Sequence, residues 1–142
     1  MRCTLKKMLY YVITVAIIVG IAAVCMVFAD DDNSKNISFL KSYGWVVDEK
    51  PIEQVGFEIP KEFDEVYKNY NELQNLSDND LEIYKGKKAM RYTYIVKNFP
   101  LKTEQTVRAN VISVNGEPVG GDVMTVNIDG FMYSLAYLEK GM

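Results

Sequence analysis

Two aspartates that adjoin glycines, Asp122 and Asp129, are the residues whose type and spacing come nearest to catalysis. Asp122 follows Gly120-Gly121, and Asp129 precedes Gly130. Two carboxylates could serve a hydrolase or lyase that needs no metal, if a cleft held them at a suitable separation. The alternative is turn chemistry, because aspartate tolerates a left-handed backbone and caps its own turn. The sequence favours the turn, and both residues stay candidates for binding without a catalytic assignment.

A second kind of site, a surface for glycan or peptide, is suggested by the many aromatic residues. Amphipathic rings gathered on one face are typical of binding surfaces. The spacing favours a core instead, because one set of rings recurs at helical steps and another alternates as in a strand. Arg91, Thr93 and Lys97 are then expected to face solvent on the opposite face of their strand. The rings concerned are Trp45, Tyr67, Tyr70, Tyr84, Tyr92, Tyr94, Phe131, Tyr133 and Tyr137.

The residue types present exclude several other chemistries. The chain has no histidine, and its two cysteines, Cys3 and Cys25, lie in or before an apolar N-terminal run. Catalysis by Ser-His or Cys-His pairs therefore lacks its residues, and zinc lacks its preferred ligands. Asp78, Asp80 and Glu82 alternate as in a calcium loop, but the required glycine and bidentate glutamate do not follow. We expect neither a cofactor nor a metal.

The charge of the chain argues against two kinds of partner. Residues 30–142 carry 13 of the 16 basic residues and all 19 acidic residues, which gives them a net charge of −6. Nucleic-acid binding needs a basic surface, so no nucleic acid is expected as a partner. The same charge disfavours a domain that lies flat on anionic lipid.

An uncharged run from Met8 to Ala29 predicts a transmembrane helix, so the lipid bilayer is an expected partner. A bilayer core requires about 20 apolar residues, and a helix satisfies its own backbone hydrogen bonds there. Basic residues are retained on the cytoplasmic side, which places the N-terminus inside and the rest of the chain outside. Gly20 lies within the run and could permit close approach of a partner helix. The flanking charges are Arg2, Lys6 and Lys7 before the run, and three aspartates at 30–32 after it.

A cleaved signal peptide is the alternative to an anchor. Val27-Phe28-Ala29 is an acceptable cleavage site, and a cut after Ala29 would release a secreted domain. Signal peptides have an apolar region of about 7 to 15 residues, so the longer run favours an uncleaved anchor.

The remaining pattern predicts an α+β domain of two helices packed on an antiparallel sheet. Residues 1–29 are expected to form the cytoplasmic tip and anchor, 30–35 a linker, and 36–142 the extracytoplasmic domain. Asn115-Gly116 predicts a tight hairpin, and Gly120-Gly121 a bulge. An apolar stripe on the second helix is expected to face the core. Helices are expected at 34–43 and 62–76, and extended segments at 45–60, 81–84, 90–96, 107–114, 119–128 and, as strand or short helix, 131–138.

Several strings in this order resemble an uncharacterised bacterial family, the domain of unknown function numbered 4830, found in small anchored or secreted proteins of Gram-positive bacteria. The likeness covers about Ser38 to Leu135. It implies an extracytoplasmic location and carries no activity, so no residue is assigned a role by it. The strings are Phe39-Leu40-Lys41-Ser42-Tyr43-Gly44-Trp45, Ile59-Pro60-Lys61-Glu62-Phe63-Asp64-Glu65-Val66-Tyr67, Arg91-Tyr92-Thr93-Tyr94, Gly120-Gly121-Asp122-Val123 and Asp129-Gly130-Phe131-Met132.

The sequence as a whole predicts a membrane-anchored, non-enzymatic module that binds or regulates an envelope protein or ligand at the cell surface. One alternative is a metal-independent hydrolase that uses Asp122 and Asp129. Another is a small accessory subunit of a membrane complex, held through its transmembrane helix. Trp45 stays a third weak binding candidate beside the two aspartates.

Overall fold

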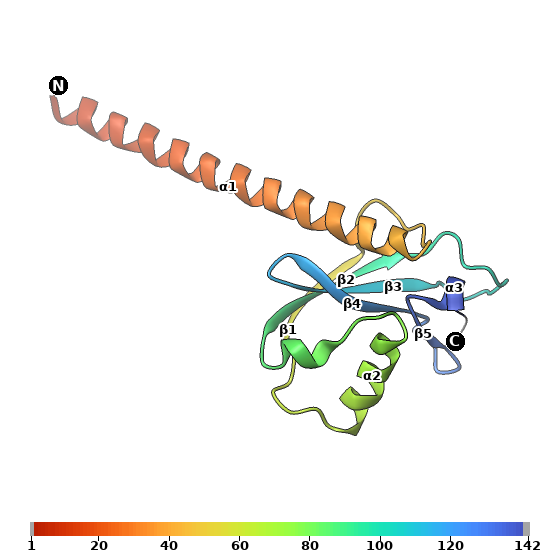
Figure 1. Ribbon diagram of the computed structural model, residues 1–142. Coiled ribbons are helices and arrows are strands. Elements are labelled where there is room, and N and C mark those ends of the chain that lie inside the picture. The colour runs from red at the N-terminus through yellow and green to blue at the C-terminus, as the bar shows by residue number, and fades with distance from the viewer. Residues whose placement is uncertain (1, 141–142) are drawn as a thin grey trace. The chain divides into compact units, whose positions relative to one another are not determined.

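A computed structural model describes the backbone of residues 2–140, and the side chains of that range except those of residues 2, 3, 5 and 19–30. The chain divides into two compact units, Met1–Asp32 and Asn33–Met142. One long helix, α1 (Arg2–Ser42), provides the whole first unit and the beginning of the second (Figure 1).

The expected linker at 30–35 and the separate helix at 34–43 are corrected by this continuous helix. Ser34, where the separate helix was expected to begin, lies inside α1. The polar stretch after Ala29 contains neither glycine nor proline, so no residue in it forces the helix to stop. The helix ends where expected, at Gly44, which has a φ of 89° and donates its N–H to the Lys41 carbonyl at 2.9 Å.

The first unit was expected to contain the membrane anchor. Met8, at the start of the expected span, is exposed. In the described part of the chain, no helix combines the length and the hydropathy needed to cross a membrane. Gly20 and Ala29 belong to the second half of the expected span, and they and the expected cut after Ala29 lie in the stretch 19–30 whose side chains are not described.

The second unit contains a five-stranded sheet with its strands in sequence order, and every pair is antiparallel (Figure 1). This confirms the predicted α+β class. The strands are β1 (Glu53–Glu58), β2 (Lys88–Ile95), β3 (Arg108–Val114), β4 (Glu117–Met124) and β5 (Met132–Ser134).

Each face of the sheet packs against its own hydrophobic cluster. On one face, Leu40 from the end of α1 and Trp45 pack against Tyr94 and other strand residues. On the other face, Phe63 and Leu81 pack beside the helix α2 (Glu65–Asn75) and the short 3-10 helix η1 (Leu81–Tyr84). Alternation along the strands separates the two sets of side chains, as period-two patterning requires.

Local chemistry explains where the elements differ from expectation. Residues 81–84 form η1 and not a strand, because the Asp80 side chain caps them by accepting the N–H of Glu82 at 2.9 Å. The helix expected from residue 62 begins at Glu65, since Asp64 caps it by accepting the N–H of Tyr67 at 2.9 Å. At the end of the chain, β5 is followed by α3 (Tyr137–Lys140), so residues 131–138 hold both a strand and the start of a helix.

The β3–β4 hairpin has the predicted turn. Asn115 and Gly116 take positive φ values of 52° and 76°, as a two-residue hairpin loop requires. The register shifts by one residue between Ile112 and Ser113, so that Ile112 pairs with Gly120 while Ser113 pairs with Pro118. Val119 is therefore the extra residue, and the bulge lies next to the predicted glycine pair.

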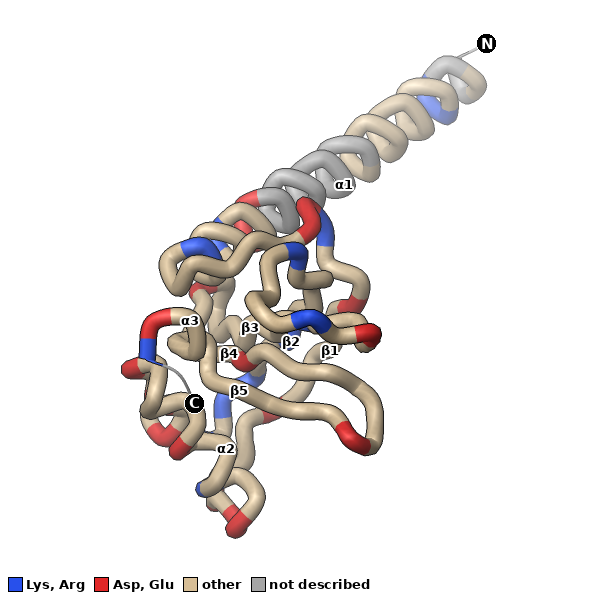
Figure 2. The backbone as a smooth tube through the Cα atoms, turned by 90° about the vertical axis from the view of Figure 1, so that its right-hand side faces the viewer, with Lys and Arg blue, Asp and Glu red and all other residues tan. Residues whose placement is uncertain are grey.

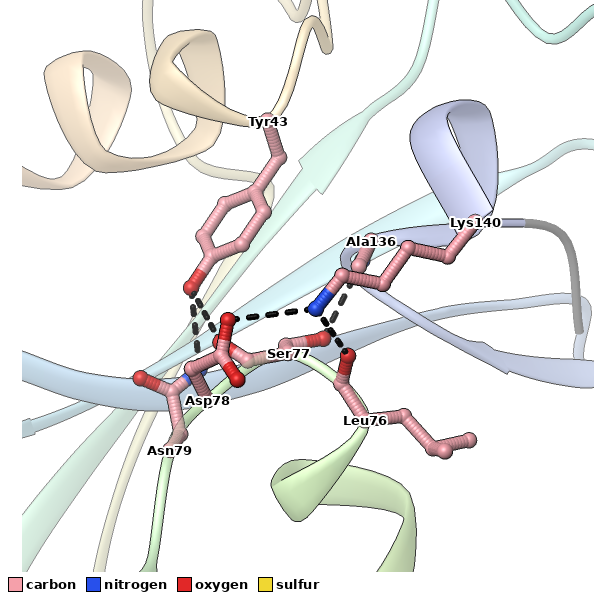
Figure 3. Close-up of polar contacts among 7 residues, drawn as sticks. All are labelled: Tyr43, Leu76, Ser77, Asp78, Asn79, Ala136 and Lys140. Carbon is pink, nitrogen blue, oxygen red and sulfur yellow. Dashed lines mark hydrogen bonds and ion pairs between the residues drawn. The ribbon is translucent and has the colours of Figure 1, made fainter.

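Polar contacts near the end of α2 hold the C-terminal segment in place (Figure 3). The Ser77 hydroxyl accepts the N–H of Ala136 at 3.1 Å, and the Ser77 carbonyl accepts the Tyr43 hydroxyl at 2.9 Å. Lys140 forms an ion pair of 3.1 Å with Asp78. Asp78 belongs to the sequence pattern that resembles a calcium loop. In the structure it helps to hold α3 near the end of α2.

Candidate functional site

A row of polar residues crosses the α2 face of the sheet. Strand pairing sets Glu53 opposite Thr93, Thr93 opposite Asn110, and Asn110 opposite Asp122. Thr93, Asn110 and Asp122 are buried, although the interior of a sheet is usually apolar. Because buried polar groups destabilise a fold unless they are hydrogen-bonded, the contacts of this row determine whether it can persist.

Hydrogen bonds connect the row and link it to α2. The Thr93 hydroxyl donates to Asn110 Oδ1 at 2.7 Å, and Asn110 Nδ2 donates to Asp122 Oδ1 at 2.9 Å. Tyr70, on α2, donates its hydroxyl to the other carboxylate oxygen, Asp122 Oδ2, at 2.6 Å. Both oxygens of this buried carboxylate therefore accept a hydrogen bond from the protein, and the network fixes the Tyr70 ring and the Asn110 amide.

Burial dominates the electrostatics of Asp122. It raises the pKa of the carboxyl, while the hydrogen bonds from Tyr70 and Asn110 and the charge of Arg91 oppose that rise without cancelling it. Burial also raises the pKa of Tyr70 well above its ordinary value, and the neighbouring Asp122 adds to the effect. Tyr70 is consequently a hydrogen-bond donor at neutral pH and not a base.

Three neighbouring cavities follow this row, and we call them together the groove. A cavity of about 180 Å³ lies over Thr93, Arg108 and Asn110, and a second of about 330 Å³ lies over Asn110, Asp122 and Tyr70. The third, of about 490 Å³, lies along α2. The first two share Arg91, Asn110 and Met124, and the last two share Tyr67, Tyr70 and Met132, so each cavity adjoins the next.

Helix α2 forms one wall of the groove with the stripe that was expected to face the core. Val66, Tyr67, Tyr70 and Leu73 line it at three- and four-residue steps, and Val66 is 74% exposed. The predicted core face of α2 is confirmed for Phe63, Tyr67 and Tyr70, which belong to or pack against the cluster on this face of the sheet, and is wrong for Val66.

Buried amides beside the stripe, four residues after Tyr67 and Tyr70, hold the helix in this orientation. Gln74 Oε1 accepts the N–H of Gly121 at 2.8 Å, and Asn71 Oδ1 accepts the N–H of Leu81 at 2.7 Å. These polar contacts dock α2 onto β4 and η1, where an amphipathic helix would ordinarily use apolar side chains. Tyr67 and Tyr70 pack on the core cluster and also line the groove, while Val66 stays exposed.

The other end of the groove carries two arginines. Arg91 and Arg108 both line the smallest cavity, together with Glu53. Arg91 lies 3.6 Å from the Glu53 carboxylate in a half-exposed ion pair, which stabilises the fold little. The Nε of Arg108 is buried and hydrogen-bonds to none of the residues that the structure describes. Figure 2 shows that acidic and basic positions both occur at many points along the backbone of the domain.

The arrangement supports binding more readily than catalysis. The Asp122 oxygens are already engaged by Tyr70 and Asn110, so the carboxylate positions its neighbours. The described residues include no group of three or more histidines, cysteines, aspartates or glutamates arranged to hold a metal ion. A polar floor, an aromatic and aliphatic wall and a cationic end are instead the features of a ligand site.

The structure separates the three residues singled out from the sequence. Asp122 lies at the centre of the groove. Asp129 is exposed in the loop between β4 and β5 and lines none of the three cavities, so the two aspartates do not form a pair in a common cleft. Trp45 is 1% exposed, and its indole N–H donates to the Leu135 carbonyl at 2.8 Å, which makes it a core residue.

Sequence reasoning missed Arg91, Thr93, Asn110 and Arg108. Thr93 was expected to face solvent but is buried, whereas Arg91 and Lys97 are exposed as expected and Arg91 also lines the groove. A signal was available in β3, where Arg108 and Asn110 share one face at strand spacing. When the strands are paired, Arg91 and Arg108 lie on the same face of the sheet as Asp122.

Comparison with known proteins identifies the family of this chain but indicates no activity for it. The curated proteins and the solved structures give no match to this chain. A family model matches residues 39–123, which include α2, strands β1 to β3 and most of β4, and hence most residues of the groove. With more than half of its length matched, the chain belongs to the family described as domain of unknown function DUF4830.

Proposed function

We propose that this chain is a membrane-anchored module with its N-terminus in the cytoplasm and its α+β domain outside, where the domain binds a ligand in the groove without changing it chemically. The proposal rests on one observation, which is the set of residues that line the groove. Its polar floor is fixed by the Asp122 network, while its apolar α2 wall stays open. Preorganised walls of this kind favour binding, because little ordering remains to oppose it.

The anchor rests on the amino-acid pattern. The uncharged run from Met8 to Ala29 is long enough for a bilayer, and basic residues precede it. A cut after Ala29 would leave the whole second unit, Asn33–Met142, in the released product. An accessory subunit would need the span itself for its partner contact, so these alternatives differ in what the N-terminal segment does.

The test is cross-linking on intact cells with a lysine-reactive reagent that cannot cross membranes, followed by purification through a C-terminal tag and mass spectrometry. We expect a reproducible envelope partner or ligand, and a recovered chain that still begins upstream of Met8. Met132→Trp should abolish recovery, because Met132 lines two of the three cavities and is partly exposed. Ile83→Trp is the matched control, since Ile83 is also exposed and lines none of the three cavities.

Each other result counts against a named part of the proposal. Cross-links that form only after lysis would place the domain inside the cell. An N-terminus at Asp30 would replace the anchor with secretion. Recovery that survives Met132→Trp, or is lost when the span alone is exchanged, would move the binding surface away from the groove. Turnover of a bound peptide or glycan would contradict a non-enzymatic role.

A further inference from the structure

The two domain arginines differ from the other basic residues in both type and position. After Arg2, the chain contains Arg91 and Arg108 as its only arginines, and every other basic residue of the domain is lysine. Both arginines line the same cavity of about 180 Å³. Arginine presents a planar fork that matches a carboxylate with two parallel hydrogen bonds, whereas lysine acts as a point charge.

Arg108 is the member of the pair with unused hydrogen-bonding capacity. Its Nε is buried yet has no hydrogen-bond partner among the described residues, and a buried donor without an acceptor destabilises the fold. Arg91 is held by Glu53 at 3.6 Å, so the weak pair leaves the Arg91 guanidinium able to turn toward a ligand. An acidic group from outside would satisfy both arginines.

The charge balance of the groove favours a singly charged ligand. The arginine end has two cations and one carboxylate, that of Glu53, and the next cavity adds the buried Asp122. A dianionic phosphate would meet these carboxylates as well as the arginines, and like charges at this range repel. A monoanionic carboxylate matches the single excess positive charge at the arginine end.

The length and lining of the groove favour an extended ligand with apolar side chains. From the arginine end, the groove continues past Tyr70 and Met132 to Val66 and Leu73 on α2. A compact acid would occupy one cavity, whereas a peptide would extend over all three.

From these observations we propose that the groove binds the C-terminal end of a peptide, with its free carboxylate on Arg108 and Arg91 and its apolar side chains against the α2 wall. This assignment rests on the proposed binding function and names the chemistry of the ligand. The residues that recognise the carboxylate and those that recognise the side chains lie at different ends of the groove, so each contribution can be removed separately.

The test measures fluorescence anisotropy of a fluorescein-labelled Gly-Ala-Ala-Phe peptide with the purified full chain in detergent. The free acid should bind at least about tenfold more tightly than its C-terminal amide, because the amide cannot form charge-assisted bonds with the arginines. Arg108→Gln should reduce the preference for the acid, and Arg108→Gln combined with Arg91→Gln should bring the acid down to the affinity of the amide. Lys88→Gln removes one cation outside the three cavities and should leave the preference unchanged.

The comparison of acid with amide in the unaltered chain does not depend on any variant folding. Equal affinities for acid and amide would overturn carboxylate recognition while leaving the groove as a binding site. N-acetyl-phenylalanine that binds as tightly as the tetrapeptide would make the ligand a small acid and not a peptide. Absence of binding by both peptides would reject the peptide assignment, and the cross-linking on cells would still decide the proposed function independently.

Discussion

At the scale of single residues, Asp122 is the most unusual group of the domain. It is 2% exposed and accepts hydrogen bonds from both Tyr70 and Asn110, and it contacts no cation closely enough to form an ion pair among the described residues. Its burial opposes ionisation more than its partners favour it, so its pKa is raised. Such a group makes the stability of the fold depend on pH with a definite sign.

We predict that Asp122 makes the domain less stable as the pH rises. The folded chain binds this proton more tightly than the unfolded chain does, so above the ordinary pKa of 3.8 the folded state carries more of it. Raising the pH through the window between 3.8 and the raised pKa then lowers the free energy of unfolding, by up to about 1.4 kcal/mol for each pH unit.

The measurement is urea unfolding of the wild type and of Asp122→Asn at several pH values from about 4 to about 7. The stability of the wild type minus that of the variant should fall as the pH rises. Asp129→Asn removes an exposed carboxylate and controls for the loss of one charge. A difference that stays constant or grows with pH would contradict the inferred burial of the carboxyl.

At the scale of elements, the close approach of α2 and β5 to strand β4 shapes the groove. Gly120 leaves room for the Gln74 side chain, since a Cβ there would lie 2.6 Å from Gln74 Oε1. Gly121 is more restricted, because a Cβ there would lie 2.1 Å from the backbone oxygen of Asn110. Gly120 thus lets Gln74 reach the Gly121 N–H, which docks the helix, while Gly121 lets β3 and β4 approach closely.

We predict that Gly121→Ala destabilises the domain by about 4 kcal/mol or more, or prevents folding, because a backbone oxygen cannot move aside as a side chain can. Gly56→Ala on β1 is the matched control. Its new Cβ would meet the Met90 sulfur at 3.4 Å, an ordinary contact. Thermal unfolding followed by circular dichroism should show Gly56→Ala within about 1 kcal/mol of the wild type. Similar stabilities for the two variants would show that β3 and β4 can separate without loss.

At the scale of the whole molecule, the folded domain includes the last turns of α1. Leu40 is fully buried in the cluster around Trp45, and the buried Asn36 accepts the Ser113 hydroxyl at 3.0 Å. Asn33 accepts the Tyr94 hydroxyl at 2.8 Å. The boundary of the second unit at Asn33 therefore falls within a continuous helix and not in a linker.

We predict that a fragment of residues 33–142 folds cooperatively and that a fragment of residues 44–142 is much less stable. Truncation of one buried leucine costs about 2 to 5 kcal/mol, and the shorter fragment also loses the contacts of Asn33 and Asn36. Urea unfolding of both fragments measures the difference. Equal stabilities would show that residues 33–43 do not belong to the folded unit.

The sequence by itself determined the class of the fold and most of its elements. Period-two alternation predicted β2 and β3, Asn115-Gly116 predicted the hairpin, and the order of helices and strands predicted an α+β domain. Several strings were enough to indicate the family. These features depend on residues that are close together in the sequence or on the order of segments along the chain. They can therefore be predicted without knowing which distant residues are in contact.

The tertiary structure alone decided the site, because a site depends on register and on which face a helix presents. Continued without a bulge, the hairpin would pair Asn110 with Gly121, and the extra residue Val119 sets Asp122 opposite Asn110 instead. A shift of one residue exchanges the two faces of a strand, so a single bulge determines whether Asp122 enters the groove. In the same way, the contact of Gln74 with Gly121 helps to set the rotation of α2, in which Tyr67 and Tyr70 pack on the core while Val66 stays exposed at the groove. Helical spacing alone cannot distinguish these positions.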